Sequence, residues 1–240
     1  MANFYKDNED LQFYVDKWLD WEPLVRVTDN HYRYADGFDN VDDAVDFYRN
    51  VLEMIGRFVA EEVDPHVAEI DQNPPELVDG EVVFPEKFDD IFEKIDQLDL
   101  HGMCVPRELG GMNAPLLVYM LQTEMFGRAD VSISANVGFH GGIAMALLAY
   151  SIDEGTTEVD PETGEILSTR FEDEIQEIMR GDAWGSMDIT EPGAGSDMAS
   201  MRTKAEQDED GNWYVTGQKI FITSGHGKYH IVIEIGRAHV

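Results

Sequence analysis

The chain has 240 residues, and 43% of them are hydrophobic, which is enough to bury a core and excludes global disorder. Its 49 acidic residues outnumber the 17 Lys and Arg, and the formal net charge of −32 disfavours nucleic acids and anionic membranes as partners. No apolar run approaches the roughly 20 residues of a membrane helix, and the acidic N-terminus MANFYKDNED lacks an apolar secretory region, so we expect a cytoplasmic protein without a membrane span.

Residues 1–40 are expected to form an N-terminal extension that contains a short amphipathic helix, DLQFYVDKWLDWEPLV. A longer helix is predicted from residue 41 onwards, because its apolar residues recur at three- and four-residue steps. Asn40 is placed to cap this helix, and acidic residues in its first turn favour the positive end of the helix dipole. Pro65 is expected to end it.

Further helices are predicted for PEKFDDIFEKIDQLDL, APLLVYMLQTEMFGRA, VSISANVGFHGGIAMALLAY and FEDEIQEIMRG. Small residues in the third of these segments would let another helix or a ligand approach closely. Residues 151–169 are expected to be an acidic surface loop, because their spacing does not fit an EF-hand calcium loop. Residues 41–182 therefore form a predicted all-α domain.

Strand patterns begin after Asp182, in AWGSMDIT, MRTKAEQ, NWYVTGQKIFITS and YHIVIEI, with DEDG as a turn between the second and the third. The predicted fold class is α+β, with the start of a β-barrel-like middle domain at 183–234. The tail 235–240 is expected to be non-native, because IGRAHV resembles the in-frame translation of a sequencing adapter.

The stretch TEPGAGSD at 190–197 breaks the strand pattern with a glycine-rich turn. Backbone amides in such a turn can converge on an anion, and the hydroxyls of Thr190 and Ser196 can donate or accept hydrogen bonds. Composition alone favours a plain turn between strands. The turn is not a Rossmann fingerprint, because Met198 stands at the third glycine position, and no P-loop Gly-Lys-Ser/Thr follows.

Two motifs, TEPGAGSD and GQKIFITSG, occur in the order and at the separation of the middle-domain signature of the acyl-CoA dehydrogenase family. VPRELGG and FGRADVSISANVGFHGG are similar to the helical N-terminal domain of that family, and the chain resembles it over roughly 41–234. The resemblance implies FAD-dependent α,β-dehydrogenation of an acyl-CoA thioester, with hydride transfer to flavin N5, in fatty acid metabolism through β-oxidation. It also implies an electron-transferring flavoprotein as the acceptor and a homo-oligomeric protein.

The resemblance further implies a set of FAD contacts on two β-segments that form a wall for the isoalloxazine ring. Ser196 would also touch the acyl-CoA, and Thr223 would hydrogen-bond flavin N5. Phe221 stands where many members have Trp, and it keeps the stacking surface while losing a hydrogen-bond donor. From the residues alone, a core aromatic at 221 and a strand-end hydroxyl at 223 are favoured. The implied contacts are Met187, Ile189, Thr190, Gly195, Ser196, Phe221, Ile222 and Thr223.

No catalytic base is assigned, because the catalytic glutamate in most of this family lies in a C-terminal helical domain that is expected to be missing here. The chain alone is therefore expected to be inactive. One alternative is an acyl-CoA oxidase or a related flavin monooxygenase-like member. The other is a non-catalytic helical interaction module.

The remaining candidate site residues are histidines and one cysteine. His226 and His230 lie four apart, but the glycines beside His226 favour a turn over a metal-binding pair. Cys104 is the only cysteine, which excludes an intrachain disulfide and a cysteine-based metal cluster. It is expected to be a buried small hydrophobe rather than a nucleophile. No metal site is predicted.

Overall fold

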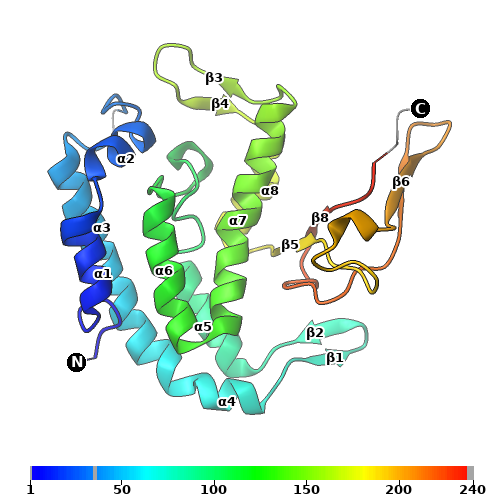
Figure 1. Cartoon of the computed structure of the whole chain (residues 1–240), viewed down its shortest axis with the longest axis horizontal. Helices are drawn as coiled ribbons and strands as arrows, with labels where there is room; N and C mark the ends of the chain where they lie inside the picture. Colours follow the sequence, from blue (N-terminus) through cyan, green and yellow to red (C-terminus); the bar gives the residue numbers. More distant parts are fainter. Residues whose placement is uncertain (1, 35–36, 237–240) are drawn as a thin grey trace. The chain divides into compact units, whose positions relative to one another are not determined.

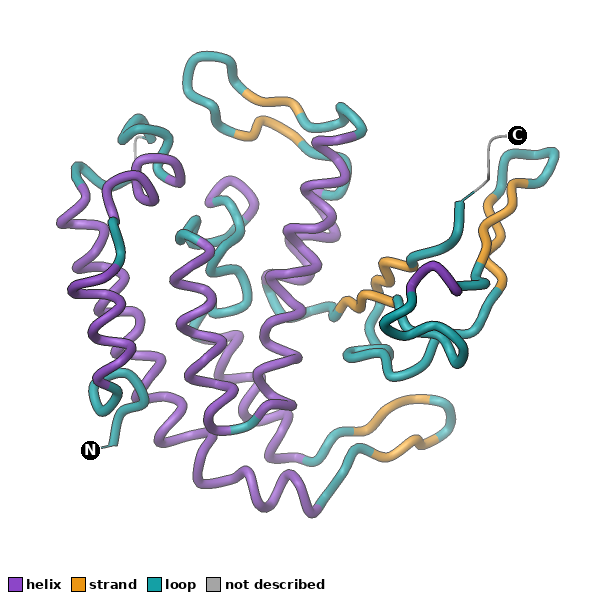
Figure 2. Tube along the Cα trace, in the orientation of Figure 1, coloured by secondary structure: helices purple, strands orange, loops and turns teal. Residues whose placement is uncertain are grey.

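The structure, a computed structural model, describes residues 2–34 and 37–236 (Figures 1 and 2). Contacts between residues divide the chain into two units, Met1–Asp182 and Ala183–Val240. The first unit is largely helical, and the second consists of short strands and turns. The chain is thus an α+β protein. The tail that we expected to be non-native lies outside the described residues from 237 onwards.

The N-terminal extension forms three short helical segments where the sequence predicted one helix. These are α1 (Glu9–Phe13), a π-helical turn η1 (Tyr14–Trp18) and α2 (Trp21–Thr28). Leu19 adopts an extended backbone, which breaks the helical path before α2. The indole Nε1 of Trp21 donates to the carbonyl oxygen of Val15 at 2.8 Å, and both side chains are buried. The extension is therefore packed, with an apolar face directed into the first unit.

The long helix predicted after residue 40 is confirmed as α3 (Val41–Phe58), and the Asn40 side chain caps it by accepting from the Asp43 amide at 3.1 Å. The prediction that Pro65 ends the helical path is wrong. The path continues through a π-helical turn η2 (Val59–Val63), a 3₁₀ turn η3 (Asp64–His66) and α4 (Val67–Gln72). Pro65 is tolerated because it lies at the start of a new turn, where its missing amide is not needed.

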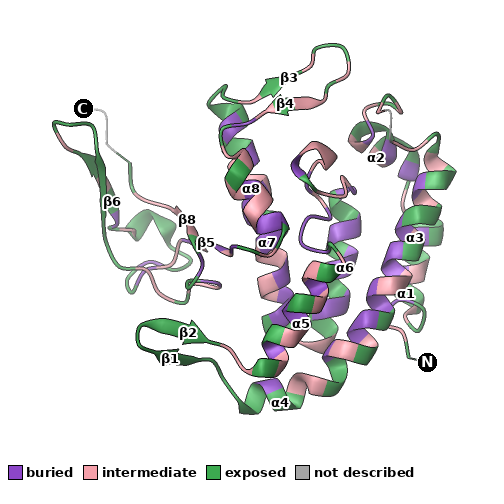
Figure 3. Cartoon of the chain, turned by 180° about the vertical axis from the view of Figure 1, so that it is seen from behind, coloured by how far each residue is buried: buried purple, intermediate pink, exposed green. Residues whose placement is uncertain are grey.

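The other predicted helices are confirmed as α5 (Glu86–Gln97), α6 (Leu116–Ala129), α7 (Val131–Asp153) and α8 (Glu172–Met179). Helix α7 packs against α6 and α8, and α6 packs against α3, so these helices enclose the core of the first unit (Figure 3). The chain between α5 and α6 contains a 3₁₀ turn, η4 (Arg107–Leu109).

Helix α7 does not fit the expectation that no apolar run reaches membrane length. Among the described residues it is the one helix long and apolar enough to cross a membrane, by length and composition alone. Of its most apolar window, 44% is buried inside the protein. Ser134 and His140 lie on the buried side, where the helix packs against its neighbours. These contacts are those of a core helix, which meets the same length and composition criterion.

Two antiparallel hairpins accompany the helices of the first unit (Figure 2). The hairpin of β1 (Glu76–Val78) and β2 (Glu81–Val83) was not predicted. The hairpin of β3 (Glu158–Val159) and β4 (Ile166–Ser168) lies in the stretch predicted to be a loop. Its turn forms because the carboxylate of Asp160 accepts hydrogen bonds from the amides of residues 162 and 163, which makes an Asx turn. The acidic composition of this stretch, taken alone, predicted a loop.

The second unit contains two strand pairs. β5 (Gly185–Asp188) pairs in parallel with β8 (Tyr229–Val232), and β6 (Lys204–Gln207) pairs antiparallel with β7 (Trp213–Thr216). A 3₁₀ turn, η5 (Met198–Ser200), lies between β5 and β6. Within the described residues every sheet has two strands, so these residues do not close a barrel.

Candidate functional site

The glycine-rich turn after β5 is closed by two backbone hydrogen bonds. The amide of Glu191 donates to the carbonyl of Ala194 at 2.9 Å, and the amide of Ala194 donates back at 3.1 Å. An added Cβ at Gly193 or Gly195 would have no neighbour within 4 Å, and Ser196 is exposed. Within the described residues the amides of Gly195 and Ser196 make no hydrogen bond. The turn thus presents open backbone amides and a hydroxyl, which suit an anion.

The predicted strand over 212–224 is wrong beyond Thr216, where β7 ends. Phe221 has a φ of 58° and Ser224 a φ of 56°, and neither fits a strand. Such left-handed conformations in non-glycine residues cost of order 1–3 kcal/mol each and cluster at functional sites. Phe221 is 89% exposed, so it is not the core aromatic that composition alone favoured. This segment therefore carries an exposed aromatic ring on an irregular backbone.

The structure brings the two motifs together. The amide of Ile220 donates to the carbonyl of Thr190 at 2.9 Å, and the ammonium of Lys219 donates to the carbonyl of Ile189 at 2.9 Å. Residues 30 positions apart are thereby held side by side, and Phe221 follows directly after this junction. The resemblance implied that two β-segments form the surface for the flavin ring. In the structure, the residues that follow β5 lie against an irregular loop instead.

The predicted contact residues occupy different parts of this arrangement. Met187 lies on β5, and Ile189 and Thr190 follow it, all partly buried. Ile222 and Thr223 are also partly buried. In the described residues no hydrogen bond joins the exposed Gly195–Ser196 end of the turn to residues 221–223. The structure therefore brings together the residues around Thr190 and Ile220, and it leaves Gly195 and Ser196 at the edge.

Sequence reasoning missed Glu191 and Lys219 as members of the site. Their side chains are 6% and 10% exposed, and Lys219 Nζ lies 3.0 Å from Glu191 Oε1. Donors at Thr203, Arg202 and Lys219 surround the carboxylate and lower the pKa of Glu191 to about 2, against the opposing effect of burial. The signal was present in the sequence, because both residues lie inside the quoted motifs.

A second polar cluster joins β5 to β8, where Ser186 pairs in register with His230. The hydroxyl of Ser186 donates to Asp188 Oδ1 at 2.7 Å and lies 2.8 Å from His230 Nδ1, which is 3.1 Å from Asp188 Oδ2. Ser186 is fully buried, so it has no access to a substrate. The cluster therefore ties the two strands together.

The two histidines that raised the question of a metal pair have separate surroundings. The ring of His226 lies 4.9 Å from that of Trp184, and although the residue is exposed, local desolvation lowers the pKa of His226. His230 instead contacts Ser186 and Asp188. Among the described residues no group of three or more His, Cys, Asp or Glu could hold a metal ion.

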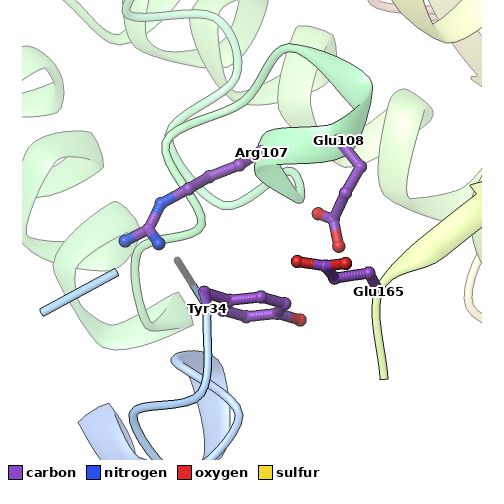
Figure 4. A pocket seen from close by; sticks show the side chains of 4 residues that line it. All are labelled: Tyr34, Arg107, Glu108 and Glu165. Atoms are coloured by element: carbon purple, nitrogen blue, oxygen red, sulfur yellow. The ribbon is translucent and has the colours of Figure 1, made fainter. Parts of the chain in front are cut away.

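The first unit holds a separate polar cavity of about 240 Å³, lined by Tyr34, Arg107, Glu108 and Glu165. Figure 4 shows the two carboxylates pointing toward one another, while the guanidinium of Arg107 points away from them. Arg107 instead donates to Asp29 Oδ1 at 3.1 Å. Burial and the two nearby carboxylates raise the pKa of Tyr34. Walls of this charge repel an anion such as a phosphate, so the cavity does not belong to an anion site.

Comparison with known proteins shows matches to two domain families. Residues 47–163 match the acyl-CoA dehydrogenase N-terminal domain, and residues 186–236 match the acyl-CoA dehydrogenase middle domain. Together the two matches cover well over half of the chain.

Individual relatives agree with these matches. The 3-methylmercaptopropionyl-CoA dehydrogenase of Ruegeria pomeroyi is 29% identical over 216 residues, 90% of this chain and 32% of its own length. The broad-specificity linear acyl-CoA dehydrogenase of Mycobacterium tuberculosis is 31% identical over 192 residues, 78% of this chain and 28% of its own length. The chain thus spans about a third of the length of the curated relatives it matches.

Among solved structures, an acyl-CoA dehydrogenase from Bacillus anthracis complexed with FAD aligns with a TM-score of 0.58 and 21% identity. The alignment covers 78% of this chain and 28% of that one, and at this identity it shows the fold alone.

Proposed function

Because the chain belongs to the acyl-CoA dehydrogenase family, we propose that the whole protein binds FAD and dehydrogenates an acyl-CoA thioester between its α and β carbons. The observation that carries the proposal is the junction between the two motifs. There the Ile220 amide donates to the Thr190 carbonyl, beside an aromatic ring that is left exposed. An exposed aromatic ring on a left-handed backbone, held beside a glycine-rich turn, is the kind of feature that clusters at binding sites.

The residues present fit a flavin. The exposed ring of Phe221 offers a flat apolar surface, which suits packing against a planar cofactor. The open turn at Gly195 and Ser196 offers amides and a hydroxyl for phosphate oxygens. When bound, FAD supplies the hydride acceptor for this reaction, and the protein supplies orientation and electrostatics.

Within this frame each remaining residue has a proposed role. Met187, Ile189 and Ile222 provide partly buried apolar contacts, and the hydroxyls of Thr190 and Thr223 provide hydrogen bonds to the ring, with Thr223 toward N5. Ser196 is proposed to contact the acyl-CoA as well as the cofactor. No residue of this chain is assigned as the base that removes the α-proton.

The substrate and the electron acceptor are part of the proposal. The proposed substrate is an acyl-CoA thioester, the class of compound for which both of these relatives are named. An electron-transferring flavoprotein is the proposed acceptor, and a homo-oligomer is the proposed assembly. The oxidase alternative differs in letting oxygen reach the reduced flavin.

The test uses the whole protein. We expect it to purify with bound FAD and to lose its visible flavin absorption anaerobically when its substrate is added from a panel of linear and branched acyl-CoAs. Reoxidation by an electron-transferring flavoprotein, without oxygen consumption, separates a dehydrogenase from an oxidase. A protein that carries no flavin and binds none when FAD is supplied would exclude the proposal.

A matched pair of threonine variants addresses the site itself. Thr223→Val removes the hydroxyl proposed to face N5, and Thr216→Val removes a hydroxyl of the same kind at the exposed end of β7. We expect Thr223→Val to slow flavin reduction by roughly 100-fold, as for other single donors that stabilise developing charge. Thr216→Val should reduce flavin at the wild-type rate.

A further inference from the structure

The ammonium of Lys219 is nearly enclosed in the second unit, and the proposed chemistry gives it no role. A primary ammonium has three N–H donors, and here each has an oxygen partner. The partners are the carbonyl oxygen of Ile189 at 2.9 Å, Glu191 Oε1 at 3.0 Å and the carbonyl oxygen of Ile233 at 2.8 Å. They belong to the residue after β5, to the glycine-rich turn and to the residue after β8. One side chain therefore joins three separate segments.

Glu191 extends this connection to a fourth segment. Its carboxylate accepts from the amide of Arg202 at 2.7 Å and from the amide of Thr203 at 2.9 Å, just before β6. The turn that begins with Thr190 is therefore held from both sides, by the Lys219 ammonium and by these amides. Burying this charged pair costs desolvation free energy, and each charge is compensated mainly by the other.

The position of Lys219 in the chain links this pair to the flavin site. Lys219 immediately precedes Ile220, whose amide is bonded to the Thr190 carbonyl, and Phe221 follows with its left-handed backbone. The ammonium thus anchors the start of the segment 221–223 to the end of β5. Removing it would leave the two carbonyls without a donor and the Glu191 carboxylate without its cation.

We propose that Lys219, paired with Glu191, is a positioning residue that sets the placement of Thr190 relative to Phe221–Thr223 and thereby the environment of the bound flavin. The inference rests on the proposed function, since it concerns the same site. Its action is through other residues, because its three donors are already used within the protein. A pair that served only to stabilise the fold would lower stability without altering a flavin once bound.

Three variants of the whole protein test the proposal. Lys219→Met keeps the length and removes the donors. Lys219→Arg keeps the charge but presents a planar fork instead of three tetrahedral donors. Glu191→Gln retains one acceptor oxygen and removes the negative charge. It tests the same pair from the other side if Lys219→Met does not fold. The control is Lys204→Met, which removes an exposed lysine of the same unit that pairs with Glu206 at 3.0 Å.

The measurements are the Kd for FAD, and the reduction potential and visible spectrum of the flavin at saturating FAD. We expect Lys219→Met and Glu191→Gln to weaken FAD binding by about tenfold or more, since each removes charge-assisted hydrogen bonds. Both should also shift the potential and the spectrum of the flavin that remains bound. Lys219→Arg should not restore them, and Lys204→Met should match the wild type.

The outcomes separate the two proposals. If the wild type binds no FAD, the proposed function fails, and this inference fails with it. If the wild type binds FAD and both variants show its Kd, potential and spectrum, the positioning role alone is refuted. A variant that unfolds at lower denaturant but holds a wild-type flavin also refutes the role, because the pair then stabilises the fold and nothing more.

Discussion

Two adjacent glycines in α7 should respond in opposite ways to alanine. A Cβ added at Gly141, which is buried, would lie 2.9 Å from the carbonyl oxygen of His101, 3.3 Å from Cε2 of Tyr119 and 3.4 Å from Sγ of Cys104. A Cβ added at Gly142, which is exposed, would have no neighbour within 4 Å. The two substitutions therefore place the same methyl group at neighbouring positions of one helix, once against packed atoms and once in open space.

The expected magnitudes follow from two opposing effects. Replacing a helix-interior glycine by alanine stabilises by about 0.8–1.0 kcal/mol, through propensity alone. At Gly142 this gain stands unopposed, so the free energy of unfolding should rise by up to about 1 kcal/mol. At Gly141 the new methyl must displace a backbone carbonyl, and overpacking of this kind costs about 1–3 kcal/mol. Gly141→Ala should therefore be less stable than Gly142→Ala by about 1–3 kcal/mol.

Urea denaturation followed by far-ultraviolet circular dichroism measures both variants against the wild type. The comparison also tests whether α7 is a core helix or crosses a membrane. In a helix surrounded by lipid, either alanine would raise the stability by a similar amount. If Gly141→Ala proved as stabilising as Gly142→Ala, α7 would not pack against the backbone at His101. The assignment of α7 to the core of the first unit would then be refuted.

Two titratable groups give further predictions. The pKa of Glu191 is lowered from 4.5 to about 2, so its contribution to stability is present above about pH 4.5 and is lost as pH falls toward 2. Glu191→Gln should therefore be less stable than the wild type at pH 7, with the difference vanishing near pH 2 in acid-dependent unfolding curves; a difference independent of pH would contradict this. Cys104 is only partly buried, where the sequence predicted full burial, and desolvation still raises the pKa of its thiol to about 11, so at pH 8 only about one thiol in a thousand is ionised. A chromogenic disulfide should react with native Cys104 about 100-fold more slowly than in urea, and comparable rates would show that the thiol is not shielded.

The helices were predictable because their signals are local. The apolar stripe of α3 and the cap at Asn40 depend on residues within a few positions of one another, and both are confirmed. The behaviour at Pro65 was not predictable in the same way. Whether a proline ends a helix or begins a new turn depends on what the following residues pack against.

The hairpins and the irregular loop required information that no short window contains. Residues 212–224 alternate like a strand, yet β7 stops at Thr216 because Lys219 and Ile220 bond to residues 189–191 instead of continuing a ladder. These hydrogen bonds join residues 28 to 30 positions apart. They depend on how the whole unit folds, and the periodicity of a short segment does not predict them. The same reason explains why Glu191 and Lys219 were seen as parts of motifs but not as partners.

The exposure of Phe221 is the observation that most supports the proposed flavin site. On composition alone, the glycine-rich turn was a plain turn and Phe221 was a core aromatic. The second of these interpretations fails because the ring is 89% exposed on a strained backbone. The buried ion pair of Glu191 and Lys219 argues against the first, because it holds that turn beside the same segment. Two nearly enclosed charges are a costly way to shape an ordinary turn, and they are well suited to a surface that must stay fixed while a planar ring lies against it.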